Sequence, residues 1–470
     1  MADSRTNSRP TGDLLIELRR DVNDPLHRQI AAAIRAGIQA RRLRLGMALP
    51  PTRQLAATLD VSRGVVVEAY QILVAEGYLT SRSGGYTRVA VGPQPEPATP
   101  RAEPTNEASI DFSSCRPDVS RFPRAAWVRS VRRVFNETPS ELLGYLPGRG
   151  VPQLRVALAE HLNRVRGTNA HPDNIVVCNG YTQGIALLFQ VLKWMGAKRI
   201  AVEDPTSDDD AVPAARALGL EVVGVPVDED GIRVDVLART AANAVVLTPS
   251  HQWPTGGVLP PESRAAVLGW AADRGALVIE DDYDAEFRYD RAPIGSMHGL
   301  APELVMYMGT ASKTLAPGLR LGWMVLPQNL VDLVAEAKVT ADRGTPTTEQ
   351  LVFADFLARG EFDRHLRRMR PAYRRRRDVL LEALSTYCPM LEPAGVAAGL
   401  HLIAWLPDTV DETAVVTEAR AQDVKIDGIG TYRLSSKGRG GLIFGYGGQT
   451  EAAMTEGVKI LGSVIAALAD

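Results

Sequence analysis

The segment VMYMGTASKTLAPGLRLGWMVL (305–326) places a lysine, several hydroxyl residues and an arginine between two apolar runs. The runs, Val305–Gly309 and Leu321–Leu326, have the length and apolar character of buried β-strands. Lys313 follows the first run closely, and Arg320 lies seven residues further on. Because ligands of open α/β sheets bind beyond the carboxyl ends of the strands, we expect ligand-binding residues directly after Val305–Gly309.

Further apolar runs precede this segment and alternate with helical patterns. Buried runs that are separated by amphipathic helices indicate a largely parallel sheet with both faces covered. The sequence therefore predicts an α/β domain beyond about residue 110. The remaining candidate strands are Ile175–Cys178, Arg199–Val202, Glu221–Val225, Ala244–Leu247 and Ala276–Ile279.

Polar segments follow two of these runs. Glu280–Tyr283 is an acidic strand end, and Asn179–Gln183 is a glycine-containing turn whose backbone N–H groups would face an anion. Taken singly, such an acidic end is usually a solvated loop, and a lone lysine is usually a surface residue. Together with Lys313 they suit an aldehyde-bearing, phosphorylated pyridine ring. The amine forms the Schiff base, the carboxylate keeps the ring nitrogen protonated, and the arginine, hydroxyls and amides hold the phosphate.

The composition is that of an ordinary cytoplasmic protein. The chain has 470 residues, a net charge of −2, 45% hydrophobic and 23% charged residues, which excludes disorder throughout and a disulfide-stapled mini-domain. Three cysteines, Cys115, Cys178 and Cys388, form no C-x-x-C pair, and their odd number favours a reducing compartment. The N-terminus carries no apolar signal region, and no apolar run approaches the roughly 20 residues of a membrane helix.

Charge and proline content divide the chain into three parts. Residues 1–92 hold 13 arginines and 8 acidic residues, a net charge of +5, so the rest carries −7. A basic unit on an acidic protein indicates an anionic partner for that unit. Between the two lies GPQPEPATPRAEPTNEAS (92–109), with five prolines, which is typical of a semi-rigid linker rather than a surface loop. We therefore expect domains at 14–91 and 110–470, joined by the linker 92–109.

The basic part has the pattern of a winged helix-turn-helix, an α+β fold. Leu26, Ile30, Ile34 and Ile38 form one helical stripe, a short helix follows from about Thr52, and a third begins after Ser62 as its N-cap. Alternating residues 78–82 and 86–91 around a Ser-Gly-Gly turn predict a hairpin. In this fold the third helix enters the major groove of double-stranded DNA.

Four residues of this part are expected to bind DNA. Arg63, at the start of the third helix, can read guanine edges or contact phosphate, and Arg53 would contact the backbone. Ser62 can donate to phosphate, and Gly84 would let the wing approach the duplex closely. The alternative is a small helical domain whose arginines are merely solvated.

Residues 25–79 resemble the GntR-type winged-helix family. The match follows the pattern LP-x-x-R-x-LA, VSR, AY-x-x-L-x-x-EGYL. Two departures are Gly64, where a side chain is usual, and a wing that reads GGYTRV.

From about Asp111 to the C-terminus the chain resembles a fold-type I, class I aminotransferase-like domain. Together with the GntR-like domain that precedes it, this domain makes the whole chain similar to the MocR subfamily of transcription regulators, which bind pyridoxal 5'-phosphate. The matching segments are LGYLPGRG (143–150), VEDP (202–205), TPSHQWPTG (248–256), IEDDYDAEFRY (279–289), GTASKTLAPGLRLGW (309–323), RHLRRMRPAYRRRRD (364–378) and AGLHLIAWLPD (398–408).

The resemblance implies a set of cofactor-binding residues. Lys313 would be the Schiff-base lysine, Asp281 would pair with the pyridine nitrogen, and Tyr283 would bond the ring hydroxyl. Tyr145 would reach the phosphate of a partner subunit, which implies a homodimer. Trp253 stands where aminotransferases usually have an asparagine. The phosphate would be held by Tyr181, Thr182, Thr310 and Arg320.

Two departures from the aminotransferase pattern weaken the case for transamination. Ser207 replaces an aromatic that would stack on the cofactor or line the amino-acid pocket, and residues 440–445 lack the arginine that clamps a substrate carboxylate. Arg433 or Arg439 remain possible substitutes. A further feature, eight arginines within 364–377, indicates either an exposed helix face or an additional surface for the DNA backbone.

These observations favour a transcription regulator over an enzyme. The leading hypothesis is that pyridoxal phosphate itself is the effector, bound through a Schiff base, as in regulators of vitamin B6 synthesis. One alternative is a response to pyridoxal phosphate plus an amino compound. Others are a working aminotransferase with an appended DNA-binding head, and a large domain that has lost its cofactor and only dimerises. A residual transaminase half-reaction is compatible with the regulator.

Overall fold

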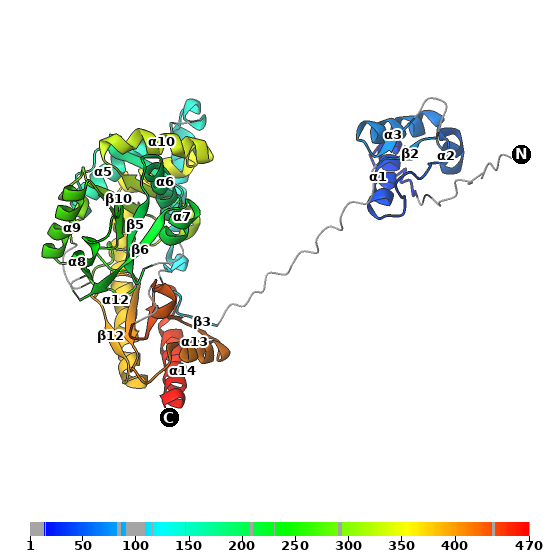
Figure 1. Cartoon of the computed structure of the whole chain (residues 1–470). Helices are drawn as coiled ribbons and strands as arrows, with labels where there is room; N and C mark the ends of the chain where they lie inside the picture. Colours follow the sequence, from blue (N-terminus) through cyan, green and yellow to red (C-terminus); the bar gives the residue numbers. More distant parts are fainter. Residues whose placement is uncertain are drawn as a thin grey trace, which may run out of the picture. The chain divides into compact units, whose positions relative to one another are not determined.

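The chain divides into two compact units, Met1–Thr105 and Asn106–Asp470 (Figure 1). The computed structural model describes residues 14, 16–81, 86–90, 109–114, 116–145, 147–206, 210–229, 231–289, 294–434 and 438–469. Gly84, Cys115, Ser207 and nearly all of the expected linker lie outside these described residues.

The small unit has three helices and a two-stranded sheet. The stripe of α1 is buried at Ile30, Ile34 and Ile38, and it packs with α3 around one apolar core. Strands β1 and β2 pair antiparallel, with Leu79 opposite Val89. The helices and the paired strands predicted from the sequence are confirmed. Their bounds are α1 (Leu26–Gln39), α2 (Thr52–Leu59), α3 (Arg63–Ala75), β1 (Leu79–Thr80) and β2 (Arg88–Val89).

The turn between α2 and α3 is fixed by backbone conformation and by one hydrogen bond. Asp60 ends α2 in the left-handed region, with φ of 51°. The Tyr70 hydroxyl of α3 donates to the Pro50 carbonyl at 2.9 Å, just before α2 begins. The left-handed Asp60 turns the chain after α2, and the Tyr70–Pro50 hydrogen bond ties α3 to the start of α2.

The large unit contains an eight-stranded sheet in the order β4-β11-β10-β9-β8-β5-β6-β7. Its central pairs are parallel, as predicted, whereas β11 and β7 run antiparallel to their neighbours. Strand β11 is antiparallel because it follows β10 without a crossover helix. The strands are β4 (Ile175–Cys178), β5 (Arg199–Asp204), β6 (Glu221–Asp228), β7 (Gly231–Ile232), β8 (Ala244–Leu247), β9 (Leu277–Asp282), β10 (Val305–Thr310) and β11 (Gly322–Val325).

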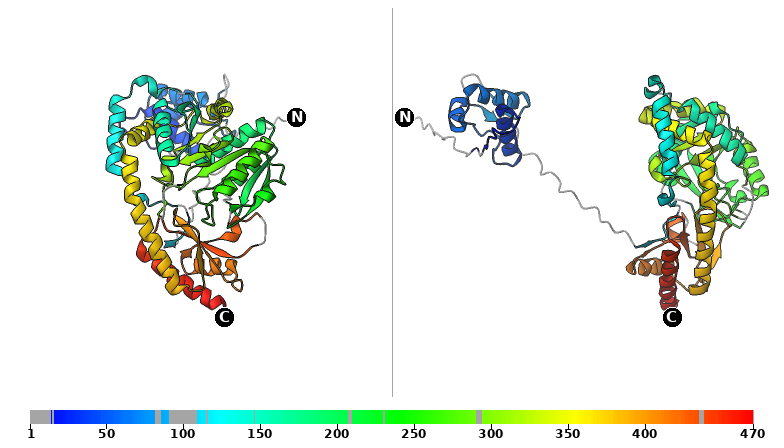
Figure 2. Two further views of the ribbon diagram at one scale, coloured as in Figure 1. Left: turned by 90° about the vertical axis from the view of Figure 1, so that its left-hand side faces the viewer. Right: turned by 180° about the vertical axis from the view of Figure 1, so that it is seen from behind.

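Helices cover both faces of this sheet (Figures 1 and 2). One face packs on an apolar layer from α6, α7 and α10, and the other packs on layers from α5, α9, α11 and α12. The helices are α4 (Arg124–Glu137), α5 (Pro152–Arg166), α6 (Tyr181–Trp194), α7 (Ala211–Ala217), α8 (Val234–Leu237), α9 (Pro261–Arg274), α10 (Gln328–Asp342), α11 (Thr347–Ala358) and α12 (Glu361–Tyr387).

The C-terminal part forms a smaller four-stranded sheet, in the order β12-β13-β16-β15, backed by two helices. A separate short pair, β3 with β14, joins the start of the unit to this part. The elements are β3 (Ile110–Asp111), β12 (Glu392–Ala394), β13 (His401–Trp405), α13 (Glu412–Ala421), β14 (Val424–Lys425), β15 (Asp427–Gly428), β16 (Gly441–Gly445) and α14 (Glu451–Ala469).

Helix α14 corrects one expectation. It has 19 residues and a mean hydropathy of 1.5, so by length and composition it could cross a membrane, although no such run was expected. Its inner face, including Met454, Val458 and Leu461, is buried in the core that it shares with α12. Packing against the rest of the unit accounts for this apolar face.

Helix α12 carries the arginine run, and its exposure is uneven. Leu366, Met369 and Tyr373 are buried, and several arginines face outward. Arg376 is instead buried, where it pairs with Asp118 at 2.6 Å, so the expectation of a wholly exposed arginine face is wrong at this position. The exposed arginines are Arg364, Arg367, Arg368, Arg374 and Arg375.

We expect Gly462→Ala to destabilise the large unit and Gly269→Ala to leave it unchanged or slightly more stable. A Cβ at Gly462 in α14 would lie 2.1 Å from the Tyr387 carbonyl oxygen, whereas Gly269 in α9 has no atom within 4 Å of such a Cβ. Overpacking costs about 1–3 kcal/mol, and alanine exceeds glycine in helix propensity by about 1 kcal/mol. Thermal unfolding of both variants checks this, and equal melting temperatures would contradict it.

Candidate functional site

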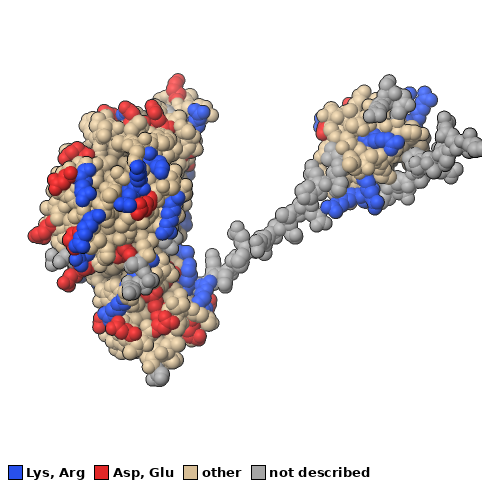
Figure 3. Space-filling model, viewed as in Figure 1, with Lys and Arg blue, Asp and Glu red and all other residues tan. Residues whose placement is uncertain are grey.

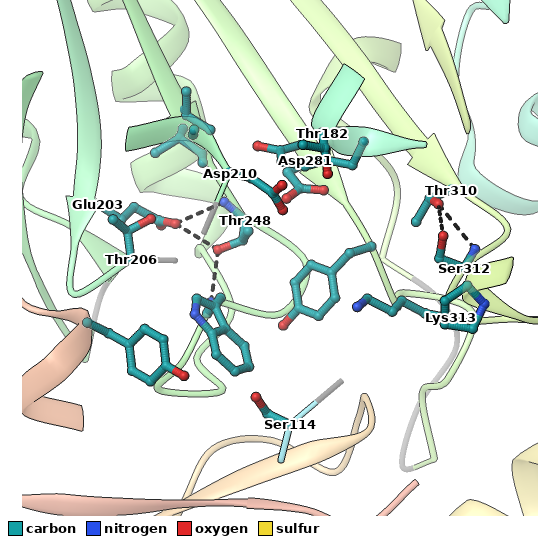
Figure 4. Close-up of a pocket in the computed structure, with 18 of the residues that line it drawn as sticks. Ser114, Thr182, Glu203, Thr206, Asp210, Thr248, Asp281, Thr310, Ser312 and Lys313 are labelled. Carbon is teal, nitrogen blue, oxygen red and sulfur yellow. Dashed lines mark hydrogen bonds between the residues drawn. The ribbon is translucent and has the colours of Figure 1, made fainter. Parts of the chain in front are cut away.

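A cavity of about 270 Å³ lies at the carboxyl ends of the parallel strands (Figure 4). It is the position that the strand ends in the sequence predicted. Nearly every predicted cofactor-binding residue lines it. The lining residues are Ser114, Tyr181, Thr182, Glu203, Thr206, Asp210, Ala211, Val246, Leu247, Thr248, Trp253, Asp281, Tyr283, Thr310, Ser312, Lys313, Pro317, Arg320 and Tyr432.

Asp281 and Lys313 reach this cavity from neighbouring strands. Asp281 lies opposite Met308 in the parallel pairing of β9 with β10, and Lys313 follows three residues after β10 ends. Burial raises the pKa of Asp281 well above its usual value, and the nearby carboxylate of Asp210 raises it further, whereas Lys313 opposes the rise. A cationic ring nitrogen beside Asp281 would stabilise the ionised carboxylate, which burial disfavours.

Hydroxyls and an arginine form the other end of the cavity. Thr310 Oγ1 lies 3.0 Å from Ser312 Oγ and accepts the Ser312 backbone N–H at 3.1 Å. Arg320, with φ of 49°, donates from Nη2 to the Asn179 carbonyl at 2.8 Å. A Cβ at Gly180 would lie 3.1 Å from Arg320 Nη2, so the glycine lets the guanidinium approach the turn.

Tyr181 and Thr182 begin helix α6 directly after that turn. The first N–H groups of a helix and its dipole favour an anion there, and Thr182 is exposed to the cavity. Burial raises the pKa of Tyr181 well above its usual value, and the neighbouring Asp281 carboxylate raises it further. The structure therefore connects Tyr181 to the carboxylate end of the cavity, a contact that the sequence did not predict.

An aromatic wall closes one side of the cavity. Trp253 packs edge-on against Tyr283 and Tyr432, with ring centroids 6.5 and 5.6 Å apart. The Tyr283 hydroxyl donates to the His251 carbonyl at 2.9 Å. The indole Nε1 of Trp253 is buried and has no hydrogen-bond partner in the described part of the chain.

Glu203 is a lining residue that the sequence analysis did not single out. Its carboxylate accepts the Thr248 hydroxyl at 2.7 Å and the Thr248 N–H at 2.9 Å. Burial raises the pKa of Glu203 to about 7. The signal was present, since Glu203 ends the apolar run of β5, whereas Ser114 and Tyr432 come from distant segments with no local pattern.

Arg433 and Arg439, the two arginines that could bind a substrate carboxylate, are bound to other groups of the protein. Arg433 donates to the Arg439 carbonyl at 2.6 Å. Arg439 pairs with Glu392 at 2.6 Å and donates to the Leu406 carbonyl. Neither contributes to the cavity lining among the described residues.

Tyr145 is the one predicted cofactor residue that lies outside the cavity. Its side chain is 92% exposed within the single chain. Contact with a partner subunit therefore stays a prediction for this residue.

The predicted DNA-binding residues of the small unit are exposed. Arg63 Nε lies 3.4 Å from the Thr52 hydroxyl, so the starts of α2 and α3, with Arg53 and Ser62, meet on one surface. Ser62 is the N-cap of α3 by position, but its hydroxyl makes no capping hydrogen bond. Figure 3 shows basic side chains on the visible face of this unit and both signs mixed on the large unit. Gly84 lies outside the described residues.

The donor set of the cavity fits pyridoxal 5'-phosphate. An amine, a buried carboxylate and a cluster of hydroxyls with an arginine and a helix N-terminus match its aldehyde, ring nitrogen and phosphate. The arginine-lined pocket for a substrate carboxylate is missing from the described lining.

Comparison with known proteins gives the family. Residues 110–416 match aminotransferase class I and II, and residues 26–89 match the bacterial regulatory proteins of the gntR family. The chain is 32% identical to the probable rhizopine catabolism regulatory protein MocR of Rhizobium meliloti, over 97% of this chain and 96% of that protein. It is 30% identical to the HTH-type pyridoxine biosynthesis transcriptional regulator PdxR of Corynebacterium glutamicum, over 93% and 96%.

Solved aminotransferases share the fold of the large unit. The multiple substrate aminotransferase of Thermococcus profundus superposes with a TM-score of 0.70 at 25% identity, covering 76% of this chain and 91% of that chain. The α-aminoadipate aminotransferase LysN of Thermus thermophilus, complexed with N-(5'-phosphopyridoxyl)-L-leucine, gives 0.69 at 27%, covering 76% and 92%. The chain therefore belongs to the MocR-type regulators, in which a GntR-type winged helix-turn-helix domain precedes a fold-type I aminotransferase domain.

Proposed function

We propose that this protein is a DNA-binding transcription regulator that senses pyridoxal 5'-phosphate and controls vitamin B6 synthesis. The observation that carries the proposal is the lining of one cavity: its described residues include the anchors for the cofactor, and their one arginine, Arg320, lies with the phosphate-binding hydroxyls. Relatives along the whole chain are named as regulators, one of them of pyridoxine biosynthesis. We take the domain limits as 14–91 and 110–470, with the linker 92–109 between them.

The residues of the cavity have distinct roles toward the cofactor. Bound pyridoxal phosphate supplies an aldehyde that joins a primary amine and an electron-withdrawing ring. Lys313 would attach it, Asp281 would hold a proton on the ring nitrogen, and Tyr283 would bond the ring oxygen. The phosphate would be held by Tyr181, Thr182, Thr310 and Arg320.

We infer that pyridoxal phosphate alone is the effector. An amino-acid ligand needs a cation for its carboxylate, and Arg433 and Arg439 are both committed to other partners. The second candidate, pyridoxal phosphate plus an amino compound, and the third, a working aminotransferase, are favoured by the retained Lys313 and Asp281. A half-reaction with an amine is compatible with the regulator.

We further propose that the protein is a cytoplasmic homodimer. The large unit exposes three large apolar side chains in neighbouring stretches of sequence: Phe135 of α4 is 65% exposed, Leu143 is 58% exposed and Tyr145 is 92% exposed. A second copy of the chain would cover these apolar side chains. The two winged-helix domains of such a dimer would bind two half-sites on double-stranded DNA.

Lys313→Ala should abolish covalent uptake of the cofactor. Wild-type protein incubated with pyridoxal phosphate and dialysed should absorb near about 420 nm, because the lysine attaches the aldehyde. Lys193→Ala, which removes an exposed lysine of α6, serves as the control and should keep the absorbance. Persistent absorbance in Lys313→Ala, or its loss in both variants, would contradict the assignment.

Arg63→Ala and Arg53→Ala should weaken DNA binding and its salt dependence. Each lost phosphate contact lowers the slope of log Kd against log salt by about one. Arg28→Ala, an exposed position on α1, is the matched control and should keep the slope. Fluorescence anisotropy with DNA from upstream of the protein's own gene measures it, and equal slopes for all four proteins would count against this surface.

Pyridoxal phosphate alone should change the affinity for that DNA by at least about fivefold, which is typical of allosteric coupling. The measurement compares cofactor-free protein, protein with pyridoxal phosphate, and protein with pyridoxal phosphate plus amines. A change that requires the amine would favour the second candidate. Sustained turnover of an amino acid with a 2-oxo acid would favour the aminotransferase.

A further inference from the structure

A hydrogen-bonded network adjoins the turn at the phosphate end of the cavity. Its centre is Asp342, the last residue of α10, and its other members are Asn179, Gln183 and Lys338. None of the four is among the described lining residues of the cavity. Asn179 stands directly before Gly180 and helix α6, so the network meets the turn whose N–H groups are expected to bind an anion.

Both carboxylate oxygens of Asp342 accept hydrogen bonds. Oδ2 accepts from Asn179 Nδ2 at 2.8 Å and from Gln183 Nε2 at 2.7 Å. It also accepts from Lys338 Nζ at 2.5 Å, and Oδ1 accepts the Gly344 N–H at 2.8 Å. Burial opposes the ionisation of this group, but the hydrogen bonds that it accepts outweigh burial and hold the pKa of Asp342 below its usual value. The carboxylate is therefore ionised and acts only as an acceptor.

These contacts fix the conformation of the turn before α6. Because the Gln183 amide nitrogen faces Asp342, the amide oxygen faces the turn, where it accepts the Asn179 N–H at 2.8 Å. A glutamine at the third position of a helix reaches back to the start of that helix in the same way in a capping box. Asn179 Oδ1 is buried without a hydrogen-bond partner in the described part of the chain, so Asp342 holds this side chain through its Nδ2.

Strand β11 and Arg320 contact the same turn. A Cβ at Gly322 would lie 2.8 Å from Gly180 Cα, so the strand and the turn are in close contact. Arg320 Nη2 donates to the Asn179 carbonyl at 2.8 Å. A shift of Asn179 would therefore move the first N–H groups of α6 and release the Arg320 guanidinium as well.

Lys338 allows a negative charge to stand beside a turn that is expected to bind an anion. The side chain of Lys338 is 0% exposed, and its ammonium group pairs with the Asp342 carboxylate. Because the pair as a whole is neutral, Asp342 can orient the turn without a net repulsion of the phosphate.

We propose that Asp342 is a positioning residue that holds the turn 179–181 in its phosphate-binding conformation, and that it thereby sets the preference of the cavity for a phosphorylated ligand. The inference rests on the proposed function and deepens it, since it assigns how pyridoxal phosphate is distinguished from pyridoxal. Positioning and simple electrostatics predict effects of opposite sign. If only its charge acted, neutralising Asp342 would strengthen phosphate binding and leave the Lys338 cation unpaired. If Asp342 positions the turn, the same change weakens phosphate binding.

The test titrates the full-length protein with pyridoxal phosphate and, separately, with pyridoxal, and follows the visible absorbance of the attached ring. Both ligands carry the aldehyde that would join Lys313, and only the first carries a phosphate. Asp342→Asn should raise the Kd for pyridoxal phosphate about tenfold and that for pyridoxal less than about twofold, because an amide cannot replace both accepting oxygens. Asp332→Asn is the matched control. It neutralises an exposed carboxylate of α10 that pairs with Arg149, and it should change neither Kd.

A background that lacks both amides, Asn179→Ala with Gln183→Leu, separates positioning from a general effect. In this background Asp342→Asn should add no further loss of pyridoxal phosphate binding, since the groups through which it acts are gone. If Asp342→Asn is insoluble because Lys338 loses its partner, Gln183→Leu alone keeps the ion pair. That variant should still weaken the binding of pyridoxal phosphate and leave that of pyridoxal unchanged.

Each other outcome overturns the positioning role. Tighter or unchanged binding of pyridoxal phosphate in Asp342→Asn would refute it, and so would an equal loss for both ligands. A further loss in the background without the two amides, or unchanged binding in Gln183→Leu, also refutes it. Wild-type protein that takes up neither ligand would refute the proposed function as well, whereas coloured wild-type protein with an unchanged ratio of the two Kd values in the variants refutes the positioning role alone.

Discussion

The pairing of β9 with β10 brings an acid and an amine from separate parts of the chain to one edge of the sheet. Met308 lies opposite Asp281, so the two strands end together and Lys313 follows within three residues. A slip of one residue in this register would turn Asp281 to the opposite face of β9. The cavity, its electrostatics and the proposed attachment of a cofactor all depend on this register.

Strand alternation also decides which acid of the Glu280–Asp282 cluster faces the cavity. Asp281 points into it, whereas Glu280 and Asp282 point away, where Glu280 accepts two backbone N–H groups. Asp282 pairs with the buried Arg166 at 2.7 Å and accepts the Tyr307 hydroxyl at 2.7 Å. Removing one partner of such a buried pair costs about 3–5 kcal/mol, so this contact ties α5 to β9 and supports the register.

Much of the fold and of the site could be predicted because apolar runs mark strands and polar residues follow them. Lys313, Asp281 and Thr310 were found in this way, at strand ends that converge in space. Ser114 and Tyr432 could not be, because they come from segments that only the packing of the C-terminal part brings to the cavity. The same applies to the burial of Arg376, the hydrogen-bond network of Asp342 and the inner face of α14, which depend on tertiary contacts rather than on local pattern.

The described lining of the cavity combines anchors for the cofactor with no second arginine that could clamp a substrate carboxylate, and covalent attachment at Lys313 is what makes this cavity a sensor. The most direct measurement is peptide mapping by mass spectrometry after the protein has been loaded with pyridoxal phosphate and reduced with borohydride. We predict one modified peptide, labelled at Lys313. No label, or a label spread over surface lysines such as Lys193, would contradict it.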